Sequence, residues 1–229
     1  MRMIITVLIL SAALCVSAFS HPRDYLVTTP YWTSPKGAFE VELRTNYAAS
    51  DSDHAGKFVH QTEVEYGLTD RLTVGVYGVW EKPQGSSLGY KETKFEAKHR
   101  LAEPGRLYFN PAIYGEYIWA SGSGSDEFEG KLILQRYISE RTNIAINGII
   151  EHEMGSDDWE SGYTLGIACQ VWPKTKLGLE LKGKPGDLYI IPGAYLDFAP
   201  NKRLNIGPSI GLTGKSTNLE IKTLLELEF

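Results

Sequence analysis

Apolar and polar residues alternate along most of this chain. In the segment NLEIKTLLELEF at 218–229, Leu219, Ile221 and Leu225 share one phase, while the other phase is mostly charged. The segment from Phe39 to Tyr47 repeats the pattern with Val41 and Leu43 between glutamates and an arginine. Because successive side chains of a strand point to opposite faces, this period of two predicts strands with one apolar and one charged face.

Read in this way, the chain contains about twelve predicted strands. They cover 38–48, 58–67, 72–82, 90–101, 106–120, 127–138, 143–153, 162–172, 177–183, 187–198, 204–213 and 218–229. Tight connections such as LTDR and AEPG take turns with looser ones such as KPQGSSLG and SGSGSDE. Short turns at one end and longer loops at the other are typical of an up-and-down antiparallel β-barrel. The fold class that we expect is therefore all-β.

The two faces of these strands favour a transmembrane barrel over a soluble one. The charged face holds too many glutamates and lysines for a dry core, whereas the apolar face is continuous. Placing the apolar face toward lipid and the charged face toward an aqueous lumen removes both difficulties. A strand of ~10 residues tilted at ~40° spans about 25 Å, which matches the apolar band of an outer membrane.

Aromatic residues on the apolar phase fall near the strand ends, as expected for two interfacial girdles. At the loop ends these are Tyr47, Trp80, Tyr117, Trp119 and Tyr163, and at the turn ends Tyr66, Trp172, Phe198 and Phe229. A general preference of aromatic residues for strands is the competing explanation. The alternating final strand with its terminal Phe229 resembles the recognition signal of bacterial outer-membrane barrels. This resemblance implies outer-membrane lipid and the barrel-assembly machinery as partners.

The charged phase supplies the candidate site, a set of lumen-lining residues. They are Glu40, Glu42, Arg44, Glu63, Glu65, Lys94, Glu96, Lys98, Arg100, Glu116, Glu129, Lys131, Glu151, Glu180, Lys182, Glu220 and Lys222. Glu153, Glu226 and Glu228 share this phase, so carboxylates outnumber cations. The residues either form an ion-pair network that fills the barrel or line a water-filled path that favours cations or neutral polar solutes. Inward glycines such as Gly166 and Gly207 leave space for water or serve strand curvature.

The first 20 residues read as a secretory signal peptide. Arg2 precedes an apolar run, and Ala18 and Ser20 have the small-residue spacing of a cleavage site. No later run approaches the ~18 apolar residues of a membrane helix. Removal of Cys15 with the signal leaves Cys169 without a disulfide partner. The net charge of -5 argues against a nucleic-acid partner.

Several longer stretches carry a family likeness. FVHQTEVEYGLTDRLTVGVYGVW, KFEAKHRLAEPGRLYFNPAIYGEY and FEGKLILQRYISERTNIAINGIIEHE resemble poorly characterised Gram-negative outer-membrane β-barrels. The lead-in TTPYWTSPKGAFEVEL is similar to the segment before the first strand of barrels associated with phenol-degradation pathways. The resemblance implies an outer-membrane location after export and a transport role. It carries over no catalytic residue.

Residues 21–37 form a separate unit before the barrel of 38–229. This segment contains Pro22, Pro30 and Pro35 and does not alternate. It is either a periplasmic tail or a plug folded into the lumen. The aromatic residues Tyr31 and Trp32 make the plug possible. Three further prolines, Pro111, Pro192 and Pro208, fall inside predicted strands and indicate bulges or breaks, because each removes a ladder hydrogen bond. Arg136 falls on the lipid phase, close enough to the turn end to reach headgroups.

The sequence offers little for catalysis or cofactors. GSSLG at 85–89 matches the nucleophile-elbow pattern around Ser87, but that motif needs a strand-to-helix turn, and here it lies between two strands. The histidines show no metal-ligand spacing, and Glu151, His152 and Glu153 point alternately to opposite faces. We therefore expect no enzyme activity, no cofactor, no metal and no catalytic residue.

The leading hypothesis is an outer-membrane barrel with both termini periplasmic that acts as a passive channel or uptake pore for small polar or cationic solutes. The alternative is a non-conducting structural or binding barrel with an ion-paired lumen. The width of the lumen and the pairing of charges across it distinguish the two. The transported solute, the oligomeric state and any further protein partner are not encoded in these patterns.

Overall fold

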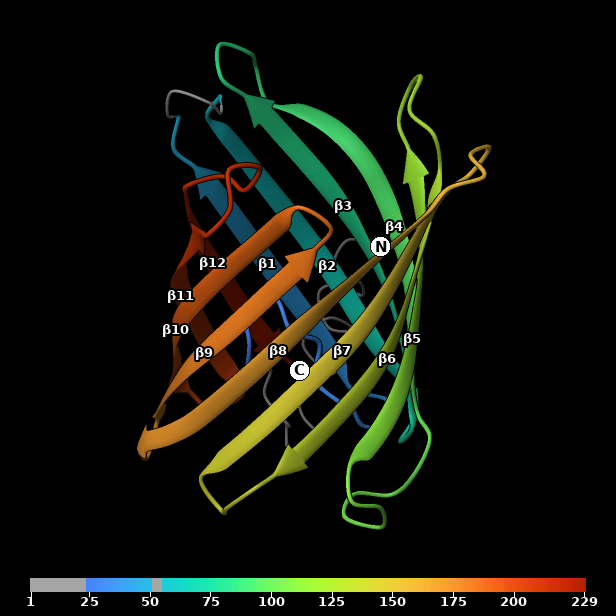
Figure 1. The fold of residues 1–229 in the computed structure, drawn as a ribbon. Coiled ribbons are helices and arrows are strands. Elements are labelled where there is room, and N and C mark those ends of the chain that lie inside the picture. The colour runs from blue at the N-terminus through green and yellow to red at the C-terminus, as the bar shows by residue number, and fades with distance from the viewer. Residues whose placement is uncertain (1–23, 51–54) are drawn as a thin grey trace, which may run out of the picture.

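The computed structural model describes residues 24–50 and 55–229. The predicted signal peptide at 1–20, together with residues 21–23, lies outside the described residues. Everything described belongs to one barrel and to the segment that precedes its first strand (Figure 1).

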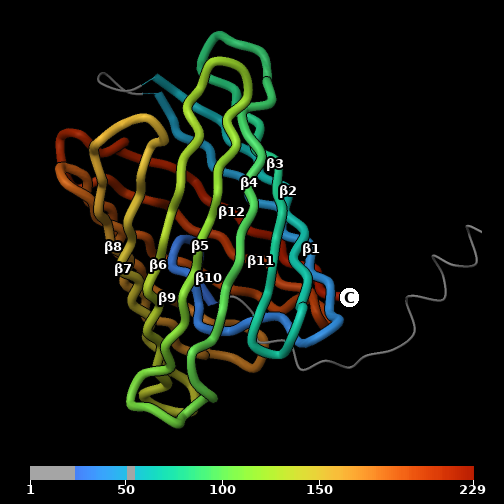
Figure 2. The backbone as a smooth tube through the Cα atoms, turned by 90° about the vertical axis from the view of Figure 1, so that its right-hand side faces the viewer, coloured from blue at the N-terminus to red at the C-terminus, as the bar shows by residue number. Residues whose placement is uncertain are grey.

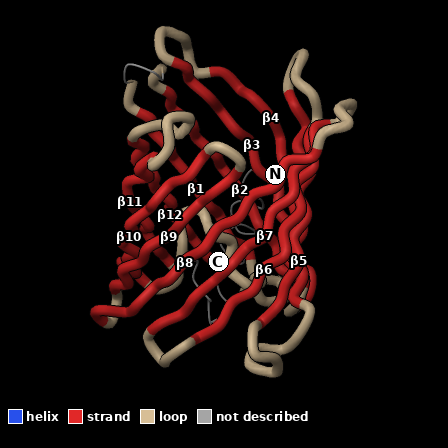
Figure 3. Tube along the Cα trace, viewed as in Figure 1, coloured by secondary structure: helices blue, strands red, loops and turns tan. Residues whose placement is uncertain are grey.

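Twelve antiparallel strands close into a barrel in which each strand pairs with its sequence neighbours and the last pairs with the first (Figures 1 and 3). Their bounds are β1 Phe39–Ala48, β2 Lys57–Thr69, β3 Leu72–Pro83, β4 Gly89–Arg100, β5 Asn110–Ala120, β6 Glu127–Tyr137, β7 Thr142–Glu153, β8 Trp159–Trp172, β9 Thr175–Lys184, β10 Asp187–Ala199, β11 Lys202–Gly211 and β12 Leu219–Glu228. The predicted all-β, up-and-down antiparallel barrel of about twelve strands is confirmed. No helix among the described residues is long and apolar enough to cross a membrane.

Closure of the barrel depends on the pairing of β1 with β12. The register runs from Glu40 opposite Glu228 to Ala48 opposite Glu220. At its end, Phe39 and Phe229 exchange backbone hydrogen bonds, with N···O distances of 2.8 and 3.2 Å. Because this seam is paired along its length, the sheet has no open edge, which a lipid environment requires.

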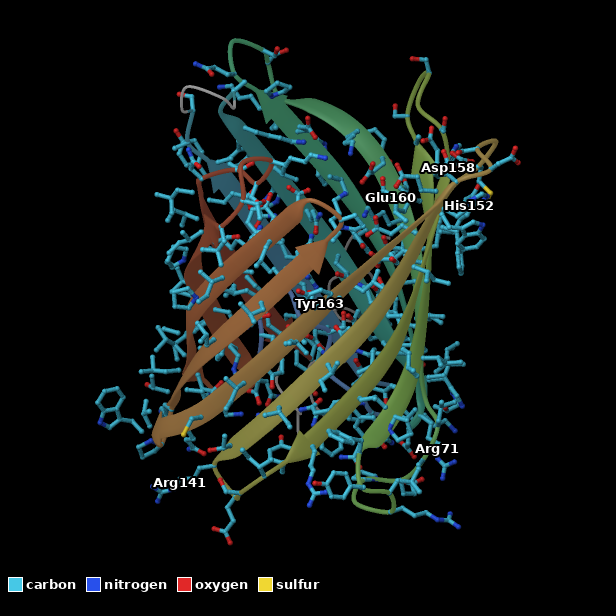
Figure 4. The ribbon with its side chains drawn as sticks, viewed as in Figure 1. Arg71, Arg141, His152, Asp158, Glu160 and Tyr163 are labelled. Atoms are coloured by element: carbon cyan, nitrogen blue, oxygen red, sulfur yellow. The ribbon has the colours of Figure 1, made fainter. Side chains whose placement is uncertain are left out.

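The strand connections differ at the two ends of the barrel. We call the end with the connections at 70–71, 101–109, 138–141, 173–174 and 200–201 the turn end. The loop end carries residues 49–50 and 55–56 and the connections at 84–88, 121–126, 154–158, 185–186 and 212–218. Arg71 and Arg141 lie at the turn end, and His152, Asp158 and Glu160 at the loop end (Figure 4). Both ends of the barrel sheet, Phe39 and Glu228, lie at the turn end.

Two predicted strand starts were wrong. β5 begins at Asn110 rather than at 106, because 101–109 forms a turn in which Gly105 has a φ of +75°. The Asn110 side chain accepts a hydrogen bond from the Gly105 backbone N–H at 2.7 Å and so fixes this turn. β8 begins at Trp159 rather than at 162 and pairs there with His152 of β7. After Trp159 the strand continues with Glu160, Ser161 and Gly162, so the apolar pattern starts later than the hydrogen-bonded strand.

The prolines within the strands have different effects. Pro111 is accommodated in β5 opposite Leu134, and its carbonyl accepts a hydrogen bond from Leu101 N–H at 2.9 Å. The β10–β11 ladder has no paired residues between Ile190–Ile210 and Ala194–Ile206, the stretch in which Pro192 and Pro208 lie. Neither proline has an N–H to donate, so the ladder is interrupted there rather than bulged.

The outer face of the barrel is apolar and the inner face is polar. Along β9, for example, Leu179 is 43% exposed whereas its neighbour Glu180 is 0% exposed. Of the predicted girdle aromatics, Trp119 and Phe229 are 59% and 69% exposed on the outside. Arg136 lies at the turn end with its guanidinium 3.6 Å from the centroid of the Tyr108 ring, and it donates to the Tyr108 carbonyl at 3.1 Å. Apolar residues facing outward and ionisable residues facing inward are the arrangement of a membrane barrel.

Candidate functional site: the lumen

The predicted lumen-lining residues lie on the strand phase that faces the inside of the barrel. Three interior cavities are lined by most of them: Glu40, Glu42, Glu65 and Lys98 at the turn end, Arg44, Lys94, Glu96, Glu116, Glu129, Lys131, Lys182 and Lys222 in the middle, and Glu220 with the last two lysines at the loop end. Glu63, Arg100, Glu151 and Glu180 have the same phase along their strands. The structure thus brings together side chains from nearly 200 residues of sequence.

The segment from Asp24 to Gly37, which we call the N-terminal segment, lies inside the ring of strands (Figure 2). Tyr25 and Tyr31 are both 0% exposed. Tyr25 and Leu26 pack in an apolar cluster with Ile191, Tyr195 and Leu224. Tyr31 packs in a second cluster with Ala112, Tyr114 and Ile133. These clusters are the apolar core of the barrel interior, and the N-terminal segment supplies part of each.

Glu180 of β9 binds the backbone of this segment. Its carboxylate accepts hydrogen bonds from the N–H groups of Leu26, Val27 and Thr28 at 2.6, 3.0 and 2.7 Å. The segment forms no sheet ladder, so its amides need acceptors from side chains. One fully buried carboxylate therefore satisfies three successive amides, and these amides in turn stabilise its charge.

Uncharged amide side chains bind the next part of the segment. Asn147 accepts from Thr29 N–H at 2.7 Å and donates to the Thr29 carbonyl at 2.9 Å. Gln135 accepts from Tyr31 N–H at 2.7 Å. Toward the turn end, Thr73 accepts from Ser34 N–H at 2.7 Å. Strands β3, β6, β7 and β9 thus all contribute to holding the N-terminal segment.

Asp24 begins the described chain within an ion-pair cluster. Its carboxylate lies 2.5 Å from Lys176 Nζ and 2.7 Å from Arg203 Nη1. Asn143 donates to it at 2.8 Å and receives a short hydrogen bond from the Tyr25 hydroxyl. Burial raises the pKa of the Tyr25 phenol, and the charges of Asp24 and Glu180 raise it further. Tyr25 therefore remains a protonated donor in this cluster.

Glycines on the inner face provide the room for this segment. A Cβ at Gly166 would lie 2.5 Å from the Tyr25 ring, and one at Gly207 would lie 2.9 Å from Leu26 Cδ1. The space expected for water is occupied by the Tyr25 ring at Gly166, whereas at Gly207 the Pro192 carbonyl oxygen of β10 lies nearest, with Leu26 beside it. At Gly178 and Gly193 the ring of Tyr195 fills the corresponding space.

Six carboxylates on β12, β1 and β2 form a lattice near the turn end. Glu40 lies opposite Glu228 and Glu65, and Glu42 lies opposite Glu226 and Glu63. Arg44 pairs with Glu42 and lies 3.6 Å from Glu63. Two triads converge, Glu40–Glu42–Glu226 and Glu42–Glu63–Glu65, and within each triad one carboxylate oxygen per residue lies within 4.8 Å of the other two. The sequence patterns weighed for metal binding, histidine spacing and the run from Glu151 to Glu153, do not reveal this convergence, which follows from strand register.

The middle cavity, of about 220 Å³, lies between this lattice and the loop end. Leu26, Val27 and Thr29 of the N-terminal segment line one side of it. Glu116 accepts from Tyr77, from Tyr114 at 2.5 Å and from Lys94 at 3.1 Å. Lys131 pairs with Glu129 at 2.7 Å. The loop-end cavity, of about 240 Å³, shares Asn46, Lys182 and Lys222 with it, so the two adjoin.

The turn-end cavity is much smaller. It has a volume of about 30 Å³, close to that of one water molecule, and is lined by Pro30, Trp32 and Ser34 of the N-terminal segment. It shares no lining residue with the middle cavity. The N-terminal segment thus lines both the turn-end cavity and one side of the middle cavity.

Residues that sequence reasoning considered for catalysis lie apart from the lumen cavities. Ser87 is exposed in the β3–β4 connection, which has no helix after it. His152 stacks on Trp159 with ring centroids 4.5 Å apart. His60 contacts Thr45 and Thr62 through its two ring nitrogens. The absence of enzyme activity, cofactor and metal remains a prediction.

Several residues that hold the N-terminal segment were missed from the sequence. They are Gln135, Asn143, Asn147 and Arg203 of the barrel, and Asp24 of the segment itself, which binds two of them. A signal for some of them was present, because Asn143 and Asn147 are uncharged polar residues on the inward phase of β7, four residues apart. Such side chains cannot form ion pairs, so they indicate binding of backbone or solute.

Solved structures of outer-membrane barrels resemble this chain. The KdgM porin is 12% identical, with a TM-score of 0.62, covering 83% of this chain and 99% of that chain. An outer membrane channel from Pseudomonas putida F1 is 15% identical, with a TM-score of 0.63, covering 87% and 98%. Outer membrane protein Omp33 of Acinetobacter baumannii is 10% identical, with a TM-score of 0.54, covering 85% and 99%. At these identities, the likeness shows a shared barrel fold.

No protein-family model matches the sequence, and no curated protein matches it. The structural likeness agrees with the predicted twelve-stranded barrel fold. Nothing in it concerns phenol degradation, so that part of the sequence resemblance stays a prediction.

Proposed function

We propose that this protein is a passive channel or uptake pore for small polar solutes in the outer membrane, with the N-terminal segment as an internal plug. The observation that carries the proposal is the pair of adjoining polar cavities that ends on Leu26, Val27 and Thr29. The likeness to porins and channels supports a pore-like role. Export by a signal peptide, periplasmic termini and recognition by the barrel-assembly machinery are further parts of this proposal.

The plug makes conductance depend on residues 21–37. We expect small or rare conductance steps from the full chain in planar bilayers, and larger steps from a variant that lacks these residues. Both proteins must first show the heat-modifiable gel mobility of a folded barrel. The absence of steps from both folded proteins would contradict the channel.

The alternative is a non-conducting binding barrel, and the packing of the N-terminal segment favours it. Tyr25 and Tyr31 are fully buried, and Glu180 binds three backbone amides. A barrel that binds solute while passing no current, even without the plug, would establish this alternative. We also propose that the protein is not an enzyme, and measurable turnover in lipid or peptide hydrolysis assays would contradict that.

A preference for cations was predicted from the surplus of carboxylates. Six of these carboxylates lie in the lattice of β12, β1 and β2 near the turn end, and Glu180 is bound to the N-terminal segment. The middle and loop-end cavities, in contrast, are lined by more cationic side chains than carboxylates. The reversal potential of the plug-deleted variant in a salt gradient measures the preference of the pore itself.

A further inference from the structure

Cationic side chains from five strands surround the middle cavity. They are Arg44 of β1, Lys94 of β4, Lys131 of β6, Lys182 of β9 and Lys222 of β12. Three carboxylates, Glu96, Glu116 and Glu129, line the same cavity. The loop-end cavity likewise has four lysines against Asp187 and Glu220. A ring of one charge sign at such a position selects solutes of the opposite sign.

Most of these charges are already compensated. Lys94 pairs with Glu116 at 3.1 Å, Lys131 with Glu129 at 2.7 Å and Lys222 with Glu220 at 2.6 Å. Glu96 accepts a hydrogen bond from the Tyr114 hydroxyl at 2.7 Å. Opposite charges in contact leave little field for a third partner, so these pairs do not attract an ion strongly.

Lys182 differs from the other lysines of the middle cavity. Within residues 24–50 and 55–229, no carboxylate oxygen lies within the 4.0 Å of an ion pair from its Nζ atom. Lys182 lines both cavities and so stands where they adjoin. Lys131 and Lys222 are close enough to act electrostatically on it, as are Glu129 and Glu151.

We infer that Lys182, at the junction of the two cavities, forms a binding site for a small carboxylate-bearing solute that enters from the loop end. The inference rests on the proposed function for the direction of entry, and it deepens that function by naming the class of solute. A carboxylate at Lys182 would supply the missing counter-charge. The cavity volumes suit a small organic acid rather than a large ligand.

Three probes with the same four-carbon skeleton test the charge preference: succinate, butane-1,4-diol and 1,4-diaminobutane. Calorimetric titration of the full chain, folded in detergent at low salt, should show binding of succinate and no binding of the other two. Added salt should weaken the binding, because it screens the attraction. Tighter binding of the diamine than of succinate would overturn the inference in favour of cations.

Substitutions locate the site. Lys182→Gln should weaken succinate binding by about tenfold, roughly the effect of 1.4 kcal/mol. Lys174→Gln is the matched control, because Lys174 is an exposed residue of the β8–β9 turn, outside the cavities. Glu151→Gln should tighten binding, because it removes a carboxylate that acts on Lys182. Equal affinity of Lys182→Gln and the unsubstituted protein would overturn the site.

These experiments can contradict the binding site and the channel independently of each other. A folded protein that binds succinate through Lys182 but never conducts would contradict the channel and leave the site intact. A conducting protein whose succinate affinity does not depend on Lys182 would contradict the site and leave the channel intact.

Discussion

Glu180 is the residue at which the barrel wall binds the N-terminal segment most directly. Its carboxylate accepts from three consecutive amides, and Tyr195 donates to it at 3.2 Å. The sequence places Glu180 on the inward phase, because period two fixes the face of every residue on a strand. The sequence does not show that the hydrogen-bond donors to Glu180 are the backbone N–H groups of residues 26–28. That contact depends on a segment without alternation, about 150 residues away.

Glu180→Ala should release the start of the N-terminal segment. Three buried amides would lose their acceptor, and each such loss costs about 1–3 kcal/mol. We therefore expect the amides of Leu26, Val27 and Thr28 to exchange with deuterium at least a hundredfold faster. Glu220→Ala is the control, because Glu220 faces inward but pairs with Lys222. Unchanged exchange in Glu180→Ala would show that other contacts hold the segment.

Glu40 lies among other carboxylates of the lattice by register. It lies opposite Glu65 on one side and Glu228 on the other, with Glu42 two residues along the same face. Like charges directly opposite in a sheet destabilise it. Glu40→Gln should therefore raise the free energy of unfolding by about 0.5 kcal/mol or more, measured by denaturant unfolding in vesicles.

Glu220→Gln serves as the control for this effect. This substitution removes a carboxylate that has a lysine partner at 2.6 Å, so the free energy of unfolding of the variant should fall or stay unchanged. A loss of stability in Glu40→Gln would mean that a cation, such as Lys98 in the same cavity, compensates the lattice.

At the scale of whole elements, alternation predicted all twelve strands and most of their bounds. Each strand needs only its own residues for that pattern. The start of β5 was predicted wrongly, because the apolar residues at 107–109 belong to a turn that the hydrogen bond between Asn110 and Gly105 holds. The position of the N-terminal segment could not be predicted either, since it depends on contacts with four strands distant in sequence.

Tyr25 of the N-terminal segment packs closely against β8 because Gly166 has no side chain. In Gly166→Ala, the added Cβ would lie 2.5 Å from the Tyr25 ring, so the ring must move. We expect more frequent opening in planar bilayers. Gly148→Ala on β7 is the matched control, because a Cβ there meets no atom within 4 Å. Equal opening frequencies in the two variants would show that displacement of Tyr25 does not gate the lumen.

For the molecule as a whole, the barrel arranges its inner charges along its axis. The carboxylate lattice lies toward the turn end, the N-terminal segment crosses the interior, and an excess of lysines lines the adjoining cavities toward the loop end. A count over the sequence predicted a surplus of carboxylates but not this separation. The separation follows from the tilt and register of strands that are far apart in the chain.

Phe229 lies at the seam that closes the barrel, where its backbone pairs with Phe39. A change of its side chain therefore tests its role in assembly separately from its role in stability. Phe229 pairs with Phe39 through two backbone hydrogen bonds, and its side chain is 69% exposed. Phe229→Ser keeps those backbone hydrogen bonds, so refolding of the purified chain into detergent should be unchanged. In cells, the amount of heat-modifiable protein in the outer-membrane fraction should fall several-fold, because the proposed recognition signal for the assembly machinery is lost. Phe198→Ser, an exposed turn-end aromatic at 54%, is the control and should assemble normally. Equal loss in both variants would attribute the effect to the aromatic girdle rather than to recognition of the final strand.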